Sequence, residues 1–451
     1  MIGSGFVEVL FLALTAGSVN ATDWMTMVQP AEYFKSRNIE PSIDRMIDFV
    51  IEDVNTPKAQ IRQLAALQYL IDESAKLKMA KNYDTNRMAI AEVAAGKRGK
   101  DSTGFAQEYA KRLLAKLDGV KPVTTKFRPL RQDALNWFPA DMKVAIAFDM
   151  HQLQDISNDT RKGILTTLSD YSRLHLYDQL ETMGNIRVDR MAFGIVDAEK
   201  PEDQKMFLRV SGKANQAWIA DSLIARSGSA LQSTKSKDAD GTPIITLHGP
   251  TTGSCVVLIG NTDFIVVSSR KFDGNHQDLV AELLAIRANK KPHATDGKLK
   301  DQLAKIPDKA IGFLVGDLPS EMRDQIRQLM DPVPARFTAY VERAPMGLDM
   351  KVESMMTDAA EAGKFVTKVV ALRKDGVAGL QKALKEPPEP GMPLMPLQSI
   401  IDLVESVQVK NQEANVQIRG FISSRLIQQL GEVYAEYNNP RSIEAPPKNG
   451  K

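Results

Sequence analysis

A short apolar run framed by a proline and an aspartate occurs twice in this sequence. The first run lies between Pro139 and Asp149. The second lies between Pro307 and Asp317, at an offset of 168 residues. In both places the proline and the aspartate are ten residues apart. A short apolar run bounded by turn-forming residues is typical of a buried strand, so the pattern predicts two similar folding units.

Each run is the first strand of an order of elements that both units share: strand, helix, hairpin, helix, hairpin, helix. Within the expected strands, apolar residues alternate with polar ones, as in Val416-Gln417-Ile418-Arg419. Such alternation predicts antiparallel sheets that expose one face to solvent. We therefore expect an α+β fold, with unit 1 at residues 138–288 and unit 2 at residues 306–438. Internal duplication is one hypothesis for this likeness, and chance similarity of two ordinary α+β domains is the other.

Asparagines mark the turns of two expected hairpins. Residues 255–268 should form a hairpin that turns at Asn261, within a Gly-Asn-Thr-Asp sequence that suits a tight turn. Residues 404–409 and 416–422 should form the second hairpin, with its turn around Asn411. We expect the two turns to be equivalent.

Residues 23–119 contain no convincing strand and predict a helical region. Apolar side chains follow helical spacing in the segment that opens at Ser42. Thr56 and Pro57 then end one helix and begin the next, because threonine caps free N–H groups and proline is tolerated at the first helical position. Two further helices are expected, the later one at Phe105 to Leu117, closed by Gly119.

Part of this region resembles a known repeat. Residues Asn55 to Leu70 read Asn-x-Pro-x-x-x-Ile-Arg-x-x-Ala-Ala-x-x-x-Leu, which resembles the start of a HEAT-type helical repeat. Residues Asp101 to Leu117 resemble a second copy, with Phe105 placed 44 residues after Ile61 but without the proline and the arginine. The resemblance implies a protein-interaction or spacer role. An irregular helical bundle is the alternative.

The layout of the two α+β units also resembles tandem domains of uncharacterised bacterial envelope proteins, and this implies organisation without any particular chemistry. Residues 1–21 add to that expectation. Val9 to Val19 is almost wholly apolar or small, and Val19-Asn20-Ala21 offers a cleavage site, which is the pattern of a signal peptide. No basic residue precedes Lys35, so an ordinary N-terminal helix is the alternative. We expect a periplasmic or secreted protein, or otherwise a cytoplasmic one.

Composition narrows the classes of function. The 58 basic and 56 acidic residues nearly cancel, so bulk charge gives no sign of a nucleic-acid partner. The single cysteine excludes an internal disulfide framework and a zinc site built from thiolates. No stretch has about 18 uninterrupted apolar residues, and we expect no membrane span. The proline-rich segment 386–397 predicts a loop, and residues 439–451 predict a disordered tail.

Four residues are candidates for catalysis, although none belongs to a known motif: Cys255, His248, Asp149 and Asp317. Cys255 follows His248 and a glycine-containing stretch, but it also opens an apolar strand, where a packing role is usual. Asp149 and Asp317 end the repeated runs, and capping of the next helix explains both. None of the five histidines has metal-ligand spacing to another. We therefore predict no catalytic residue, no metal and no cofactor. A cryptic hydrolase would require these four side chains to converge on one cleft.

Methionine usage suggests a different function. The chain has 19 methionines, and Met346, Met350, Met355 and Met356 cluster around one expected strand. Methionine fills irregular cores and also lines adaptable apolar grooves. The leading hypothesis is a non-enzymatic, exported protein with an interaction or structural role in the cell envelope, with a protein partner on the helical region. A carrier of a hydrophobic ligand, lipid or peptide, in an α+β groove is the first alternative.

Overall fold

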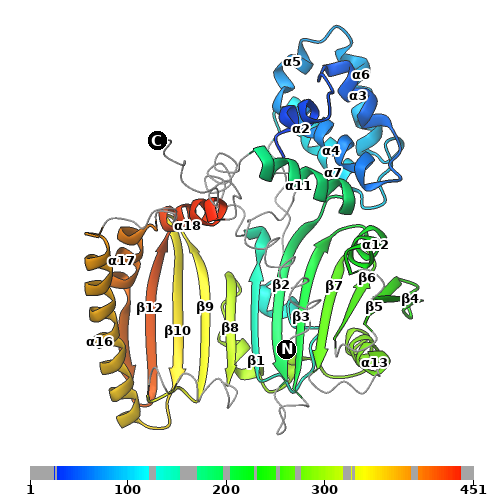
Figure 1. Cartoon of the computed structure of the whole chain (residues 1–451). Coiled ribbons are helices and arrows are strands. Elements are labelled where there is room, and N and C mark those ends of the chain that lie inside the picture. The colour runs from blue at the N-terminus through cyan, green and yellow to red at the C-terminus, as the bar shows by residue number, and fades with distance from the viewer. Residues whose placement is uncertain are drawn as a thin grey trace, which may run out of the picture.

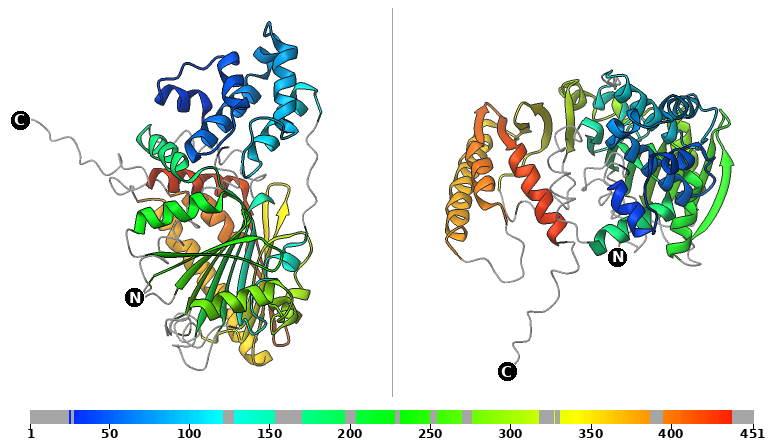
Figure 2. Two further views of the ribbon diagram at one scale, coloured as in Figure 1. Left: turned by 90° about the vertical axis from the view of Figure 1, so that its right-hand side faces the viewer. Right: turned by 90° about the horizontal axis from the view of Figure 1, so that it is seen from above.

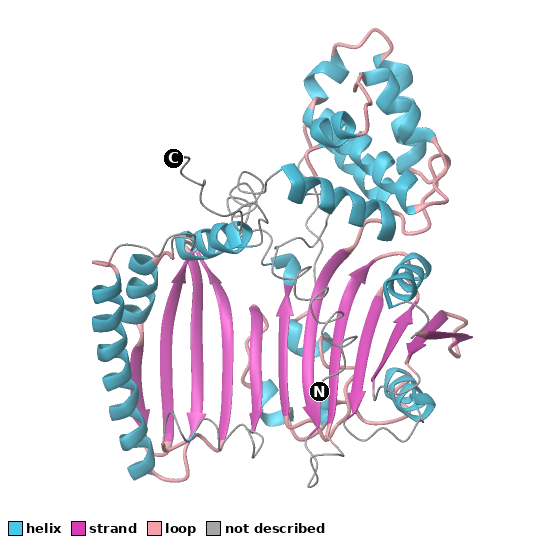
Figure 3. Cartoon of the chain, in the orientation of Figure 1, coloured by secondary structure: helices cyan, strands magenta, loops and turns pink. Residues whose placement is uncertain are grey.

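The chain folds into a helical region that stands over one half of a wide antiparallel sheet (Figures 1 and 3). This computed structural model describes Met25 and residues 28–120, 128–152, 170–196, 204–227, 231–249, 254–269, 276–317, 327, 331–386 and 395–437. Within these residues the α+β class predicted from the sequence is confirmed.

The N-terminal region is helical, as expected. Thr56 Oγ1 accepts a hydrogen bond from Ala59 N at 3.2 Å, and Pro57 is the first residue of its helix. Gly119, just past the last helix, has the positive φ of a C-terminal cap. The HEAT-type arrangement is not confirmed. The helices are α2 (Pro30–Ser36), α3 (Ile43–Ile51), α4 (Pro57–Asp72), α5 (Ser74–Lys78), α6 (Tyr83–Ala94) and α7 (Phe105–Leu117).

Twelve strands of the described residues form one sheet, so the strands of both expected units belong to the same layer. Their order across the sheet is β11-β12-β10-β9-β8-β1-β2-β3-β7-β6-β5-β4, and β1 pairs with β8 at the boundary between the units. The strands are β1 (Val144–Asp149), β2 (Arg187–Val196), β3 (Lys205–Lys213), β4 (Gln232–Lys237), β5 (Pro243–His248), β6 (Ser254–Ile259), β7 (Asp263–Ser269), β8 (Ala310–Asp317), β9 (Arg336–Ala344), β10 (Gly347–Met355), β11 (Gln408–Gln412) and β12 (Asn415–Ser423).

Helices cover both faces of the unit 1 half of the sheet. One face packs Leu208, Val256 and Val266 against the helix α12 (Gln216–Ser227). The opposite face packs alternate residues of the same strands, such as Phe207 and Val257, against three other helices. These are α8 (Leu130–Asp133), α13 (His276–Arg287) and α14 (Lys300–Ala304), with the short turn η4 (Ala294–Asp296) beside α14.

The unit 2 half carries the long helix α16 (Ala359–Ala383) and the helices α17 (Leu397–Ser406) and α18 (Ser424–Tyr437) around β10–β12. Val416 and Ile418 pack against α16. Arg419, which alternates with them, is exposed to solvent. The solvent-exposed sheet face that the alternation predicted is therefore present at Arg419 in β12.

The helix α11 (Asp170–Met183) joins the helical region to the sheet (Figure 2). Tyr177 and Leu180 of this helix share one apolar core with the helical region. Tyr33 Oη donates a hydrogen bond to Glu181 Oε1 at 2.8 Å, and Arg37 pairs with the same carboxylate at 3.1 Å. The helical region is thus packed onto unit 1 through both apolar and polar contacts.

Two sequence predictions at the second hairpin are wrong. Residues 404–406, expected to be strand, end the helix α17, and Asn411, expected in the turn, lies within β11 opposite Val416. The turn is formed instead by Glu413, with a positive φ, and Ala414. The helical spacing of Leu397, Ile400, Ile401 and Val404 carries the α17 signal. The strand β4 was not anticipated, because this exposed edge strand lacks apolar residues.

Several expectations lie outside the described residues. They are the signal peptide at 1–21, most of the proline-rich loop and the tail at 439–451. The sequence also predicts a polar turn at 197–203, a helix that starts near Ser157 and a helix at 319–330, and these fall wholly or largely outside the described residues. These stay predictions.

Candidate functional site

The two repeated aspartates do not form a carboxylate pair. Asp149 is fully buried and accepts hydrogen bonds from Gln152 N and Gln152 Nε2, both at 3.0 Å, which is the capping role anticipated for it. Asp317 donates its backbone N–H to Lys143 O, at the other end of β1, and its carboxylate accepts from Arg336 Nε at 2.9 Å. Lys143 and Asp149 are six positions apart along an extended strand, which is about 20 Å.

Cys255 and His248 lie opposite each other on adjacent strands, β6 and β5. The Cys255 side chain is buried in the core, and this burial raises the pKa of its thiol to about 12. A nucleophilic cysteine requires the opposite shift. In addition, β6 is four strands away from β1, about 19 Å, so neither residue approaches Asp149. The convergence that the hydrolase hypothesis required is absent.

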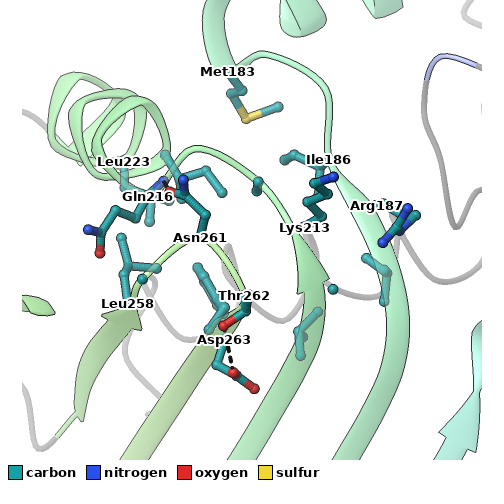
Figure 4. Close-up of a pocket in the computed structure, with 17 residues that line it drawn as sticks. Met183, Ile186, Arg187, Lys213, Gln216, Leu223, Leu258, Asn261, Thr262 and Asp263 are labelled. Atoms are coloured by element: carbon teal, nitrogen blue, oxygen red, sulfur yellow. Dashed lines mark hydrogen bonds between the residues drawn. The ribbon is translucent and has the colours of Figure 1, made fainter. Parts of the chain in front are cut away.

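A pocket opens where β2, β3, β6 and β7 end beneath the helical region (Figure 4). It encloses about 800 Å³, including its open mouth. The helix α12 forms one wall and the strands form the floor. Its lining residues are Met183, Ile186, Arg187, Val188, Val210, Gly212, Lys213, Ala214, Gln216, Ile219, Leu223, Leu258, Gly260, Asn261, Thr262, Asp263 and Phe264.

The interior of this pocket is mostly apolar because of the strand period. Val210 and Phe264 are opposite each other on β3 and β7, so their side chains lie on the same face of the sheet. Ile219 and Leu223, one helical turn apart on α12, face them. Met183, the last residue of α11, closes the side toward the helical region (Figure 4).

Two basic residues line the same pocket and bind one carboxylate. Arg187 begins β2 and Lys213 ends β3, and the sheet register places them directly opposite each other. Glu108 of α7 accepts from Arg187 Nη1 and from Lys213 Nζ, each at 2.7 Å. Like charges opposite each other in a sheet destabilise it, and Glu108 offsets that repulsion. We call these three residues the Glu108 clamp.

Other groups of α7 and β2 complete the surroundings of the clamp. The Phe105 ring, one helical turn before Glu108, lies 5.0 Å from Lys213 Nζ. Asp189 pairs with Arg187 Nε at 3.0 Å. Burial acts to raise the pKa of Glu108, but the Lys213 hydrogen bond and the Arg187 charge outweigh it and leave the pKa below its ordinary value. For Asp189, burial prevails over Arg187 and His151 and raises the pKa.

The turn at Asn261 forms another part of the rim and contacts the helical region. Asn261 Oδ1 accepts from Gln216 N at 3.2 Å, and its Nδ2 donates to Ser102 O at 3.2 Å. Asn215 caps α12 through Ala217 N and also donates to Ser102 Oγ at 2.7 Å. The sequence predicted the turn at Asn261, and the structure confirms it. Its contact with Ser102 has no signal in the sequence.

Sequence reasoning missed the Glu108 clamp, because its members are distant along the chain and form no motif. One signal was present. The sequence also predicts strands at 188–196 and 206–212, joined by a hairpin turn. In the observed register of these two strands, β2 and β3, Arg187 lies opposite Lys213. A like-charged pair at that position requires a neighbouring anion.

Within the part of the chain that the structure describes, no group of three His, Cys, Asp or Glu side chains is arranged to hold a metal ion. The described helices also include none that is long and apolar enough to cross a membrane.

No protein-family model and no curated protein matches this chain. Three solved structures that match are crystal forms III, I and IV of TP0453. They are 12%, 11% and 13% identical to this chain, with TM-scores of 0.33, 0.32 and 0.33. Each match covers 67% of this chain and 96–98% of TP0453. These scores are too low to carry an argument about function.

Proposed function

We propose that this protein is a non-enzymatic binding protein that holds an apolar ligand in the pocket beneath its helical region. The observation that carries the proposal is the pocket itself, whose apolar interior is built from β2, β3, β6, β7 and α12. Pockets for small ligands are typically concave and mostly apolar, with a few polar groups that orient the ligand. This pocket has that composition.

The pocket also fits the carrier hypothesis better than the hydrolase hypothesis. The four candidate catalytic residues do not meet in one cleft, because Cys255 and His248 lie far from Asp149, and Cys255 is a buried, protonated thiol at neutral pH. The polar groups that do meet are Arg187, Lys213 and Glu108, and they form ion pairs at the pocket rim. Such a rim can orient a ligand without reacting with it.

Blocking the pocket tests the proposal. Ile219→Trp places a large ring into the pocket from α12, whereas Ala217→Trp adds the same ring on the exposed side of that helix. We expect the neutral dye Nile red to bind the native protein and A217W, and to lose most of its binding in I219W. Native mass spectrometry of the purified protein should show a co-purified apolar ligand that I219W lacks. Equal dye binding by both variants would place the apolar site elsewhere.

An envelope location is a second part of the proposal, supported by the signal-peptide pattern of residues 1–21. Fractionation of the native host, followed by N-terminal sequencing, tests it. A mature chain that begins near Thr22 would establish export. An intact Met1 in the cytosolic fraction would remove the envelope from the proposal and leave the pocket untouched.

A protein partner on the helical region is a further candidate. Met79 and Met88 of this region are 78% and 68% exposed, which is unusual for large apolar side chains. Cross-linking in the host, compared between the native protein and the M79K/M88K double variant, tests this surface. A partner that is captured equally by both would bind elsewhere.

A further inference from the structure

We propose that the ligand is a long-chain carboxylate whose head group replaces the Glu108 carboxylate between Arg187 and Lys213 while its chain enters the apolar pocket. This inference rests on the proposed function and adds the chemical class of the ligand. It also makes Glu108 an internal competitor for the head-group position.

Arg187 and Lys213 form a carboxylate-binding site at the edge of the apolar pocket. Arg187 and Lys213 belong to the pocket lining and also bind the Glu108 carboxylate, each at 2.7 Å. One carboxylate therefore already occupies a two-cation site at the edge of an apolar cavity. A ligand with the same head group would find its hydrogen-bond donors in place.

The two adjacent positive charges of Arg187 and Lys213 favour an anionic ligand over a neutral one. Arg187 and Lys213 are cross-strand partners, so an anion is needed between them in any state of the site. Asp189 also pairs with Arg187, but it contacts Arg187 Nε, whereas Glu108 contacts Nη1 on another edge of the guanidinium. Exchange of Glu108 for a ligand carboxylate preserves the charge balance. A neutral ligand in this position would take the Glu108 carboxylate away from Lys213 and leave Arg187 with Asp189 alone.

Glu108 belongs to a different part of the fold from the two cations that it binds. It is carried by α7, whereas both cations belong to the sheet. Two other contacts between the helical region and unit 1, Arg37 with Glu181 and Gln60 with Asn185, do not involve the pocket-lining residues. Replacement of Glu108 would therefore release one anchor of α7 and leave the others. Ligand affinity is then reduced by the cost of opening the clamp.

Paired ligands and five variants, one of them a control away from the pocket, test the inference. Dodecanoate and dodecanol have the same chain, and their affinities are measured by displacement of Nile red from the full chain. We expect dodecanoate to bind about tenfold more tightly, because one charge-assisted hydrogen bond corresponds to about a factor of ten or more. K213Q and R187Q should abolish this preference, and K213R should retain it.

The E108Q variant gives the sharpest result. If Glu108 competes with the ligand, its neutralisation should tighten dodecanoate binding by about tenfold and leave dodecanol unchanged. R37Q is the matched control, because it breaks another ion pair between the helical region and α11 away from the pocket. It should change neither affinity. Circular dichroism confirms that each variant is folded.

The outcomes separate the two proposals. If neither ligand displaces dye, and no dye binds, the proposed function fails. If both ligands bind equally and E108Q has no effect, the pocket accepts apolar ligands but the head-group inference is overturned. If E108Q weakens dodecanoate binding, Glu108 supports the pocket and does not compete for it, which also overturns the inference.

Discussion

Ile146 of β1 lies directly opposite Leu314 of β8, and the two residues are 168 positions apart in the sequence. The same offset separates Asp149 from Asp317. Two copies of one unit, paired through the same strand in antiparallel orientation, would place equivalent residues opposite each other at a local two-fold axis. The register at Ile146 and Leu314 is the one that such an arrangement requires.

The strand order supports the same hypothesis. From the central pair outward, unit 1 runs β1-β2-β3-β7-β6 and unit 2 runs β8-β9-β10-β12-β11. In each unit the fourth strand outward is the last in sequence. Unit 1 then continues into β5 and β4, which have no counterpart among the described strands of unit 2. Duplication remains a hypothesis, now with a register and a topology to support it.

Gly316→Ala should destabilise the junction between the two units. Gly316 has a φ of +145°, and a Cβ there would lie 2.1 Å from Lys143 O. We expect a loss of at least about 2 kcal/mol in the free energy of unfolding, measured by urea denaturation. The control is Gly312→Ala on the same strand. Its Cβ would meet the edge of the Phe148 ring. Because Phe148 is 42% exposed, we expect the ring to turn aside and the loss to stay below about 1 kcal/mol.

Gln60→Ala should weaken the attachment of the helical region. The buried Gln60 side chain donates to Asp101 Oδ1 at 2.9 Å and accepts from Asn185 N at 2.8 Å. Removal leaves both partners buried without this contact, at a cost of about 2–4 kcal/mol. Gln68→Ala, which removes a hydrogen bond to Asp72 within α4, should cost much less. Thermal unfolding measures both losses of stability. If Gln60→Ala and Gln68→Ala lost similar amounts, Gln60 would not link the helical region to unit 1.

The Glu108 clamp should weaken in acid. Because folding lowers the pKa of Glu108, the clamp contributes stability above the ordinary carboxyl pKa of about 4.3 and loses it as the pH falls through the lowered value. Glu108 faces Arg187, Lys213 and Arg112. Asp189 acts with the opposite sign, since its raised pKa means that protonation relieves a burial cost.

The E108Q variant isolates the Glu108 contribution from the Asp189 contribution. We expect E108Q to lose about 1 kcal/mol at neutral pH, a modest value because the Glu108 side chain is 35% exposed and water screens the ion pairs. The difference from the native protein should shrink as the pH falls below about 4. Denaturation curves at a series of pH values measure it, and a constant difference would contradict the prediction.

Cys255 should be unreactive in the native protein. Burial raises its thiol pKa to about 12, so the thiolate is negligible at neutral pH and reagents have no access. Labelling by a disulfide reagent should be slow in buffer and rapid in denaturant. Fast labelling of the folded protein would show that β6 opens locally.

Local patterns predicted most of the elements correctly. The alternation in β12, the cap at Thr56 and the turn at Asn261 depend on residues close together in the sequence, so each can be recognised from a few positions. The prediction failed where two local signals competed. Asn411 has turn chemistry, but the positive φ at Glu413 and the pairing with Val416 keep it in a strand.

The sequence by itself determined that this chain has a helical region, two sets of strands with matching order, and no motif of known chemistry. Only the tertiary structure decided that both sets form one sheet and that Glu108 meets Arg187 and Lys213. The physical reason is distance along the chain. Periodicity and capping are local properties, whereas β1–β8 pairing and the Glu108 clamp bring together residues 79 to 172 positions apart, and these depend on how complete elements pack.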